Sequence, residues 1–310
     1  MTERRNIAAS VRQRLLNASR TRREDFQVTL TRYALERLLY RLSKSTHRDQ
    51  FVIKGAMLFS AWNEVPHRPT RDLDLLSFGA SDISRLEEMF REIVNTNVEP
   101  DGLEFFAESV RGVRIKEDQE YEGVRLSIQA RLEQARLSLQ IDVGFGDAVT
   151  PAPEEIEYPT LLADSPVPRL RAYSRYSVVA EKFQAMVMLG IANTRMKDFF
   201  DVWTLARSFD FDGRVLCQAM KVTFKRRETE VPSTAPLALT QEFYGDRTKQ
   251  SQWGAFLKRS QLAAQSTTLD EVATVLRDFL LPPASAVVEG KPTFDARWTP
   301  ATGWQMTSAK

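Results

Sequence analysis

Asp72 and Asp74 are the two residues in the sequence whose spacing most directly suggests chemistry. They stand two positions apart in RDLDLL, which reads as a β-strand. Successive side chains of a strand point to opposite faces, so both carboxylates share one face while Leu73 and Leu75 point into a core. Two carboxylates on one face repel each other unless a cation lies between them, and Mg²⁺ with its substrate phosphates commonly fills that position. The structural alternative is an acidic strand end that faces water.

A glycine-containing turn just upstream favours the metal interpretation. The sequence before the aspartates reads as a short apolar strand (Phe51–Ile53), a Lys-Gly-Ala turn (54–56) and the start of a helix (Met57–Trp62). An acidic strand end alone does not require this arrangement. We therefore expect the stretch Phe51–Phe78 to form the centre of the site.

A third carboxylate, Asp142, closes a predicted β-hairpin. Apolar and polar residues alternate over 124–132 and again over 137–143. Asp142 lies on the polar face of the second strand, beside the loop VGFGD. A third carboxylate on a strand near the first pair is what a two-metal phosphoryl-transfer site requires. A solvent-facing aspartate on an amphipathic strand is the alternative.

Lys182 and Asp198 lie on two predicted helices further along the chain. Lys182 stands in the middle of the apolar helix Val178–Leu189, where a lysine either extends to the helix edge or meets an anion. Asp198 lies near the start of a second helix, Arg195–Arg207, where the helix dipole favours acids. Taken singly, each residue has a structural explanation.

Helices and strands must hold these residues in place. The apolar spacing predicts helices over 6–20, 26–42 and 81–95, and short strands over 103–106 and 110–115. Five prolines predict a connector over residues 147–175. From Phe209 onward the sequence suggests helices without identifiable chemistry, and then a tail with Trp298 and Trp304 between prolines.

Composition excludes several classes of protein. The 310 residues are 43% hydrophobic and 27% charged, which is typical of a folded soluble chain. The single cysteine, Cys217, excludes an internal disulfide and fits a reducing compartment. No apolar run is long enough to cross a bilayer, and the first residues lack a secretory signal. We therefore expect a cytoplasmic protein without a membrane partner.

Positive charge is concentrated at the N-terminus, although the net charge is only +2. Such a density of basic side chains could follow a phosphate backbone. The alternative is a solvated helix face, or one that meets an acidic partner. The basic residues among the first fifty are Arg4, Arg5, Arg12, Arg14, Arg20, Arg22, Arg23, Arg32, Arg37, Arg41, Lys44 and Arg48.

Together these motifs resemble the AbiEii/AbiGii family of nucleotidyltransferase toxins, which includes the MenT toxins of bacterial toxin–antitoxin and abortive-infection systems. The resemblance covers roughly Asn6 to Arg207 and lies in the combination of motifs. They are KGAMLF, RPTRDLDLL, LQIDVGFGD, AEKFQAMV and RMKDFFDVWTL. It implies an α+β fold: a polymerase-β-like nucleotidyltransferase core with a small mixed or antiparallel sheet and flanking helices, plus N-terminal helices and a mostly helical C-terminal region.

The implied division of the chain has four parts. They are a basic helical segment (1–50), the nucleotidyltransferase core (51–150), a mostly helical domain carrying Lys182 and Asp198 (151–281), and a proline-containing extended tail (282–310).

The resemblance also implies roles for individual residues. Asp72, Asp74 and Asp142 match metal-binding carboxylates. Gly55 and Ala56 match the turn whose backbone N–H groups receive the triphosphate. Lys54, which precedes them, is expected to bind the nucleotide as well. Ala56 stands where relatives have Gly or Ser, so a hydroxyl contact is missing.

Four further positions are expected near the nucleotide or the acceptor. Lys182 matches a phosphate-binding lysine, and Asp198 matches an aspartate needed for activity near the acceptor or nucleotide. Thr70 matches a Ser or Thr that an antitoxin kinase phosphorylates in some members, and Arg71 is placed to touch phosphate.

The implied reaction uses Mg²⁺ and an NTP. An acceptor hydroxyl attacks the α-phosphorus and pyrophosphate leaves, largely through positioning and electrostatic stabilisation. The implied acceptor is an RNA, with the tRNA 3′ end expected, and a cognate antitoxin is the expected protein partner. The alternatives are a phosphotransferase acting on a protein, a catalytically silent binding protein with the same fold, and a metal-dependent nuclease.

Overall fold

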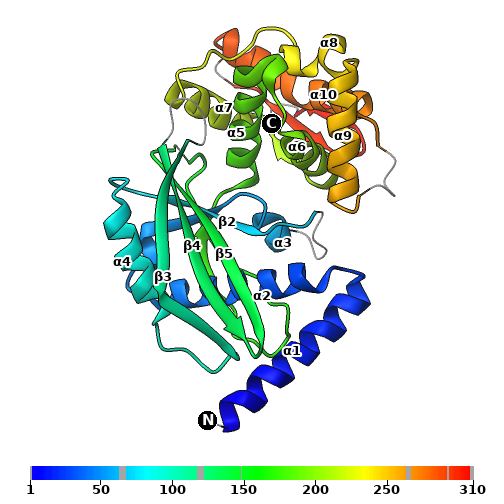
Figure 1. Cartoon of the computed structure of the whole chain (residues 1–310). Helices are drawn as coiled ribbons and strands as arrows, with labels where there is room; N and C mark the ends of the chain where they lie inside the picture. The colour runs from blue at the N-terminus through cyan, green and yellow to red at the C-terminus, as the bar shows by residue number, and fades with distance from the viewer. Residues whose placement is uncertain are drawn as a thin grey trace. The chain divides into compact units, whose positions relative to one another are not determined.

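The chain forms two compact units, shown in a computed structural model (Figure 1). The first unit holds Met1–Gly146 and Glu154–Ala172, and the second holds Asp147–Pro153 and Tyr173–Lys310. The structure describes residues 2–62, 68–116, 122–147, 149–262, 267–291 and 293–307.

Two helices open the first unit, as the apolar spacing predicts. Helix α1 spans Thr2–Arg22 and α2 spans Phe26–Lys44. The Asp25 side chain caps α2 by accepting a hydrogen bond from the Val28 backbone N–H at 3.1 Å. Nearly all of α2 is buried, so it serves as the central support of this unit.

A seven-stranded mixed sheet is the centre of the first unit, in the order β3-β4-β5-β2-β1-β7-β6. Strand β2 runs parallel to β5, and β1 runs parallel to β7; the other pairs are antiparallel. The expected α+β fold with a mixed sheet is confirmed. The strands are β1 (Phe51–Lys54), β2 (Asp72–Ser77), β3 (Leu103–Lys116), β4 (Glu122–Leu132), β5 (Ala135–Phe145), β6 (Glu154–Glu157) and β7 (Arg169–Ala172).

One face of this sheet is apolar and carries the core. The alternating residues of β4 and β5, such as Leu126 and Ile141, are fully buried. Helices α2 and α4 (Ile83–Val94) pack against the sheet and each other, and Figure 1 shows α2 lying behind β4 and β5. The opposite face carries the polar residues of β2, β4 and β5.

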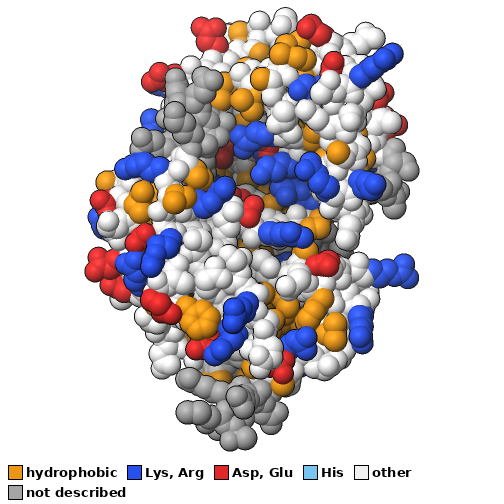
Figure 2. Space-filling view, viewed as in Figure 1, with side chains coloured by type: hydrophobic (Ala, Val, Ile, Leu, Met, Phe, Trp, Pro, Cys, Tyr) orange, Lys and Arg blue, Asp and Glu red, His pale blue; other side chains and the backbone are white. Residues whose placement is uncertain are grey.

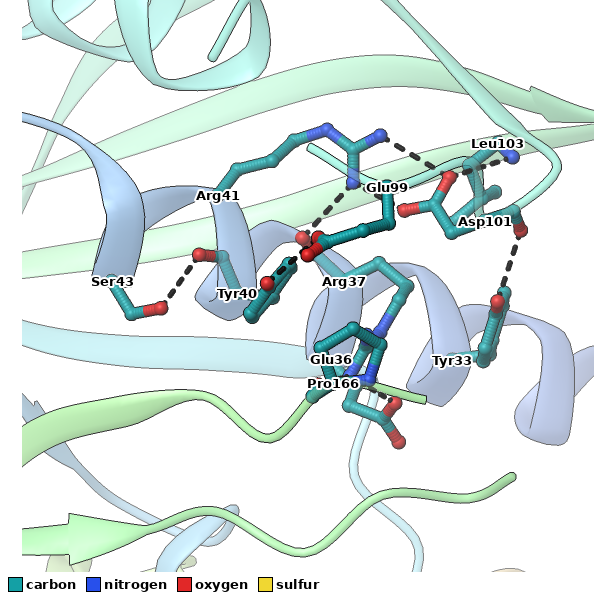
Figure 3. Close-up of polar contacts among 10 residues, drawn as sticks. All are labelled: Tyr33, Glu36, Arg37, Tyr40, Arg41, Ser43, Glu99, Asp101, Leu103 and Pro166. Carbon is teal, nitrogen blue, oxygen red and sulfur yellow. Dashed lines mark hydrogen bonds and ion pairs between the residues drawn. The ribbon is translucent and has the colours of Figure 1, made fainter. Parts of the chain in front are cut away.

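A polar network, drawn in Figure 3, fixes α2 to two loops of the first unit. Arg41 donates to both carboxylate oxygens of Asp101, at 2.5 and 3.2 Å, while Tyr33 donates to the Asp101 backbone carbonyl. Arg37 pairs with Glu36 at 2.8 Å, and the side chains of these two residues are each 1% exposed. Arg37 also donates to the Pro166 carbonyl. Glu36 also accepts a hydrogen bond from the Leu161 backbone N–H. The loops near 100 and 160 are thereby tied to the helix that supports the sheet.

Most of the connector predicted over residues 147–175 belongs to the first unit. Residues 154–172 return to the first unit, where β6 and β7 extend the sheet and Ile53 pairs with Ala172. The predicted boundary at residue 150 is therefore wrong for this segment. Pro159, Pro166 and Pro168 lie between β6 and β7. A proline has no backbone N–H, and in this segment none is needed to pair strands. Likewise the two short strands over 103–115 form one strand, β3, with a register shift between Phe106 and Arg111.

The second unit is mostly helical, with a small three-stranded sheet in the order β10-β9-β8. Its helices are α5 (Arg175–Leu189), α6 (Met196–Ser208), α7 (Gly213–Arg226), α8 (Gln241–Tyr244), α9 (Arg247–Arg259) and α10 (Leu269–Val288), and its strands are β8 (Phe211–Asp212), β9 (Ala296–Thr299) and β10 (Gly303–Met306). The expected helices that carry Lys182 and Asp198 are α5 and α6.

The prediction of an extended tail from Pro282 is wrong. Pro282 and Pro283 lie inside α10, and β9 and β10 form a hairpin. A proline removes one helix hydrogen bond, the one to the carbonyl four residues earlier. For Pro283 that carbonyl belongs to Phe279, and it accepts the Trp304 indole N–H at 2.9 Å instead. Trp298 similarly donates to the Ala206 carbonyl, so both tryptophans do pack on the unit as expected. Residues 308–310 of the predicted tail lie outside the described residues.

Charges of both signs share the surface. On the face seen in Figure 2, basic and acidic side chains are interspersed, and hydrophobic side chains show only in small separate areas. Among the described residues, no helix combines the length and the apolar character needed to span a membrane.

Candidate active site

Four charged residues form a row across four neighbouring strands of the first unit. The strand registers pair Lys54 with Asp74, Asp74 with Asp142, and Asp142 with Arg125. Residues that pair directly across strands point to the same face of a sheet. The order along the row is therefore cation, carboxylate, carboxylate, cation. Asp72, two positions before Asp74 on the same strand, lies on the same face.

The burial pattern of β2 is consistent with the prediction that both aspartates lie on one face of the strand. Leu73 and Leu75 are at most 1% exposed, whereas Asp72 and Asp74 are half-buried. The period of two along the strand places the leucines in the core and the carboxylates on the opposite face.

Gly55 lies directly against Asp74. A Cβ atom at Gly55 would lie 2.6 Å from Asp74 Cγ, and the residue has φ +75°, a conformation that favours glycine. Beyond this turn, α3 (Leu58–Trp62) begins with hydrogen bonds from Leu58 N to Gly55 O and from Phe59 N to Ala56 O. The turn and the aspartate pair are thus one structural feature, although Gly55 and Asp74 stand 19 positions apart in the sequence.

Asp142 is held by Arg125. The guanidinium donates from Nε and Nη2 to the two carboxylate oxygens, each at 2.8 Å, and Gln140 donates to one of them at 3.4 Å. Asp142 is 9% exposed. The hydrogen bond to Asp142, together with the charges of Asp142, Asp72 and Asp74, raises the pKa of Arg125 against the effect of burial. All three carboxylates therefore act electrostatically on Arg125.

The remaining predicted residues of this unit surround the aspartates. Lys54 ends β1 and is 7% exposed, Thr70 donates its hydroxyl to the Asp72 carbonyl at 3.3 Å, and Arg71 is exposed. Thr70 is half-buried and contributes to the start of β2. Its phosphorylation and the nucleotide contacts of Lys54 and Arg71 stay predictions.

The donor set fits a divalent ion that binds together with substrate. Among the residues that the structure describes, no three His, Cys, Asp or Glu side chains lie close enough to hold a metal by themselves. Mg²⁺ commonly takes one or two carboxylates from a protein and completes its shell with water and substrate phosphates. Asp72 and Asp74 supply two hard oxygen donors on one face, and the missing Cβ at Gly55 lets the Asp74 carboxylate lie directly against the turn.

Lys182 and Asp198 form a buried cluster in the second unit. Lys182 Nζ lies 2.6 Å from Asp198 Oδ1 and 2.9 Å from Asp201 Oδ2, and Arg195 Nε lies 3.0 Å from Asp198 Oδ2. The side chains of Asp198 and Asp201 are 1% and 0% exposed, while that of Lys182 is 14% exposed. Helix α6 thus holds the lysine of α5 with two carboxylates.

Asp198 is a buried carboxylate whose pKa is lowered by its two basic neighbours. Burial raises the pKa of this carboxyl, but the charges of Lys182 and Arg195 overcome that effect, so the pKa lies below its ordinary value. Asp198 is therefore an anion sealed behind a lysine. The described contacts of this carboxylate are with Lys182 and Arg195, and its role in the reaction stays a prediction.

Arg227, at the end of α7, fixes the other side of α5. Its guanidinium lies 3.0 Å from Asp147 and 3.6 Å from Glu181, and it donates to Gln184 at 3.1 Å. Arg227 is 9% exposed. Since Glu181 immediately precedes Lys182, these contacts restrict the rotation of the helix that carries the lysine.

Several of these residues were missed by sequence reasoning. Asp201 could have been found, because Asp198 and Asp201 stand three apart on a helix and face the same side. Arg125 and Arg227 give no local signal, since their partners lie 17 and 80 residues away. A cavity of about 780 Å³ in the second unit includes Arg207, Trp298 and Trp304 in its lining, but none of the predicted site residues.

The Gly turn, the paired aspartates on the following strand and the mixed sheet define a nucleotidyltransferase. The family model described as nucleotidyl transferase AbiEii toxin of type IV toxin–antitoxin systems matches residues 37–278, more than half of the chain. The chain therefore belongs to the AbiEii toxin family, as the sequence motifs predict.

Two solved structures are similar to the chain, each 16% identical. JHP933 from Helicobacter pylori aligns with a TM-score of 0.48, over 86% of this chain and 94% of its own. A candidate nucleotidyltransferase from H. pylori aligns with a TM-score of 0.47, over 86% of this chain and 96% of its own. No curated protein is similar enough to the chain to count as a relative.

Proposed function

We propose that this chain transfers a nucleoside monophosphate from an NTP to an RNA acceptor, with the tRNA 3′ end as the expected acceptor. The observation that carries the proposal is the close approach of Gly55 to Asp74, which joins a phosphate-binding type of turn to two carboxylates on one strand face. The AbiEii family relationship supports the same reaction class.

Asp72 and Asp74 hold the divalent ion, expected to be Mg²⁺, in this proposal. When bound, the ion stabilises negative charge on the triphosphate and on the leaving pyrophosphate. The backbone at Gly55 and Ala56 receives phosphate oxygens, and the glycine allows Asp74 to lie directly against this turn. Lys54, on the next strand, adds positive charge beside Asp74.

Lys182 supplies the second positive element. Its ammonium is fixed by Asp198 and Asp201, yet 14% of its side chain remains exposed. A lysine held in one position loses less conformational entropy when it binds a phosphate, so the entropy cost of ordering it lowers the binding free energy less. Asp198 contributes by positioning Lys182.

Exposed arginines at the end of α1 support an RNA acceptor. Arg20, Arg22 and Arg23 are exposed, whereas Arg12 and Arg14 are engaged by Glu133 and Asp164. Phosphate contacts from such side chains provide sequence-independent affinity for nucleic acid. We expect growth inhibition through translation when the acceptor is tRNA, a cognate antitoxin as the partner, and action in the cytoplasm, where NTPs and tRNA occur.

The test incubates the purified protein with total tRNA and each of the four α-labelled NTPs, with and without Mg²⁺. We expect labelled tRNA with one preferred NTP, loss of label without the ion, and loss of label in Asp72→Asn. Glu88→Gln, an exposed carboxylate of α4, is the matched control and should retain activity. Label on another RNA would correct the acceptor; no labelled RNA with any NTP would contradict the proposal.

A further inference from the structure

The pair between Arg125 and Asp142 raises a question that the proposed reaction leaves open. Asp142 is the natural third carboxylate of the site, because the register places it beside Asp74. Both of its oxygens nevertheless accept hydrogen bonds from one guanidinium, at 2.8 Å each. A bidentate arginine–carboxylate pair is among the stronger charged contacts in proteins.

A metal ion and Arg125 would use the same carboxylate oxygens. Ligation by Asp142 would bring the metal ion close to the guanidinium, and a guanidinium beside a divalent cation adds repulsion. The two cations therefore oppose each other at Asp142.

Arg125 can leave Asp142 without disrupting the fold. Its side chain is 42% exposed, whereas that of Asp142 is 12% exposed. A long, half-exposed arginine can turn into solvent at modest cost. The buried carboxylate cannot follow it, so displacement leaves Asp142 in place beside Asp74.

We propose that Arg125 is the resident counter-ion of Asp142 and competes with the divalent ion, so that Asp142 becomes a metal ligand only when Arg125 leaves. The nucleotide-free site then binds metal weakly through Asp72 and Asp74. The third ligand becomes available when the triphosphate brings further charge to the site. This inference rests on the proposed metal site at Asp72 and Asp74.

The experiment measures Mn²⁺ binding to nucleotide-free protein, by electron paramagnetic resonance of the free ion. We expect Arg125→Gln to bind Mn²⁺ about tenfold more tightly than the unmodified chain, since it removes a charge-assisted competitor. Arg125→Lys keeps the charge without the bidentate geometry, and should give a smaller gain. Arg131→Gln is the control, because Arg131 lies on the same strand and pairs with Glu104 at 2.5 Å; its affinity should not change.

A double-mutant cycle separates ligation from simple charge removal. In the Asp142→Asn background, Arg125→Gln should change Mn²⁺ affinity by no more than about twofold, because the ligand that Arg125 releases is gone. If the full gain persists there, or if Arg125→Gln binds Mn²⁺ no more tightly than the unmodified chain, the inference is wrong. Circular dichroism checks that each variant is folded, and Arg125→Lys provides the same comparison if Arg125→Gln is not.

The proposed metal site has its own readout in the same experiment. Asp72→Asn and Asp74→Asn should each weaken Mn²⁺ binding with Arg125 present or replaced. If neither does, the metal site itself is wrong. If both do while Arg125→Gln has no effect, the site stands and only the competition fails.

Discussion

Lys182 Nζ lies 2.6 Å from Asp198 Oδ1, and the carboxylate that holds it is only 1% exposed. Breaking a buried ion pair by removing one partner commonly costs about 3–5 kcal/mol, because the other charge is left without compensation. Asp201 shares the lysine at 2.9 Å, so each carboxylate can be tested while the other remains.

The first prediction concerns this lysine. Asp198→Asn should lower kcat/KM for the NTP about a hundredfold, since a displaced ammonium no longer meets the phosphates. Asp201→Asn should act in the same direction. Steady-state kinetics with increasing NTP measures the change, at a temperature where unfolding scans show the variants folded. Asp278→Asn, an exposed residue of α10, is the control. Unchanged kcat/KM in a folded Asp198→Asn would contradict the role of Asp198.

A second prediction concerns the turn. Gly55→Ala should reduce transfer about a hundredfold, because its Cβ displaces the Asp74 carboxylate, and a displacement near 1 Å has effects of that size. The positive φ adds about 1 kcal/mol of strain. Ala56→Gly, at the neighbouring position, should leave transfer within about threefold, since the backbone donors remain. Equal activity in both variants would show that transfer does not depend on the position of the Asp74 carboxylate against Gly55.

How far sequence reasoning reached depends on the distance between interacting residues. The shared face of Asp72 and Asp74 follows from the period of two along a single strand, so it could be predicted. The row of Lys54, Asp74, Asp142 and Arg125 could not. It depends on the register of four strands, one of which pairs parallel to a strand more than sixty residues away.

The C-terminal region shows the same limit in another form. Two adjacent prolines normally end a helix, and the sequence near Pro282 therefore suggests an extended tail. The helix nevertheless continues, and the indole of Trp304, over twenty residues later, donates to the carbonyl that Pro283 leaves without a helix donor. Only the tertiary structure reveals such a compensation.

A third prediction concerns Glu36, beneath the sheet of the first unit. Burial raises its pKa to about 7 from an ordinary value of 4.5, against the attraction of Arg37. Between about pH 4.5 and pH 7 the folded state therefore binds more protons than the unfolded state. The contribution of this carboxyl to the stability of the folded state is fully present below pH 4.5 and is lost as pH rises through about 7.

The variant Glu36→Gln lacks this titration. The free energy of unfolding of the unmodified chain, relative to that of Glu36→Gln, should fall by on the order of 2–3 kcal/mol between pH 4.5 and pH 8. Urea denaturation at several pH values measures the difference, and Glu88→Gln is the exposed control. A difference that does not vary with pH would mean that Glu36 titrates normally.

A fourth prediction concerns the acceptor. Reversing the charge of Arg20, Arg22 and Arg23 together should weaken tRNA binding about tenfold at low salt and reduce its salt dependence, because three phosphate contacts are lost. The control reverses three exposed basic residues of α9, Arg247, Lys258 and Arg259. Filter binding at several salt concentrations measures both. Equal affinity of the unmodified and reversed chains at low salt would remove the end of α1 as the RNA surface.

The central claim is that this chain transfers the nucleotidyl group and that Asp72 and Asp74 are required for it. The most direct measurement supplies the same NTP labelled either in the α-phosphate or in the γ-phosphate, with tRNA and the unmodified chain or Asp72→Asn. We expect the α-label in the RNA, the γ-label in released pyrophosphate, and neither product with Asp72→Asn. Transfer of the γ-label to a protein, or α-labelled RNA at an undiminished rate with Asp72→Asn, would contradict the account.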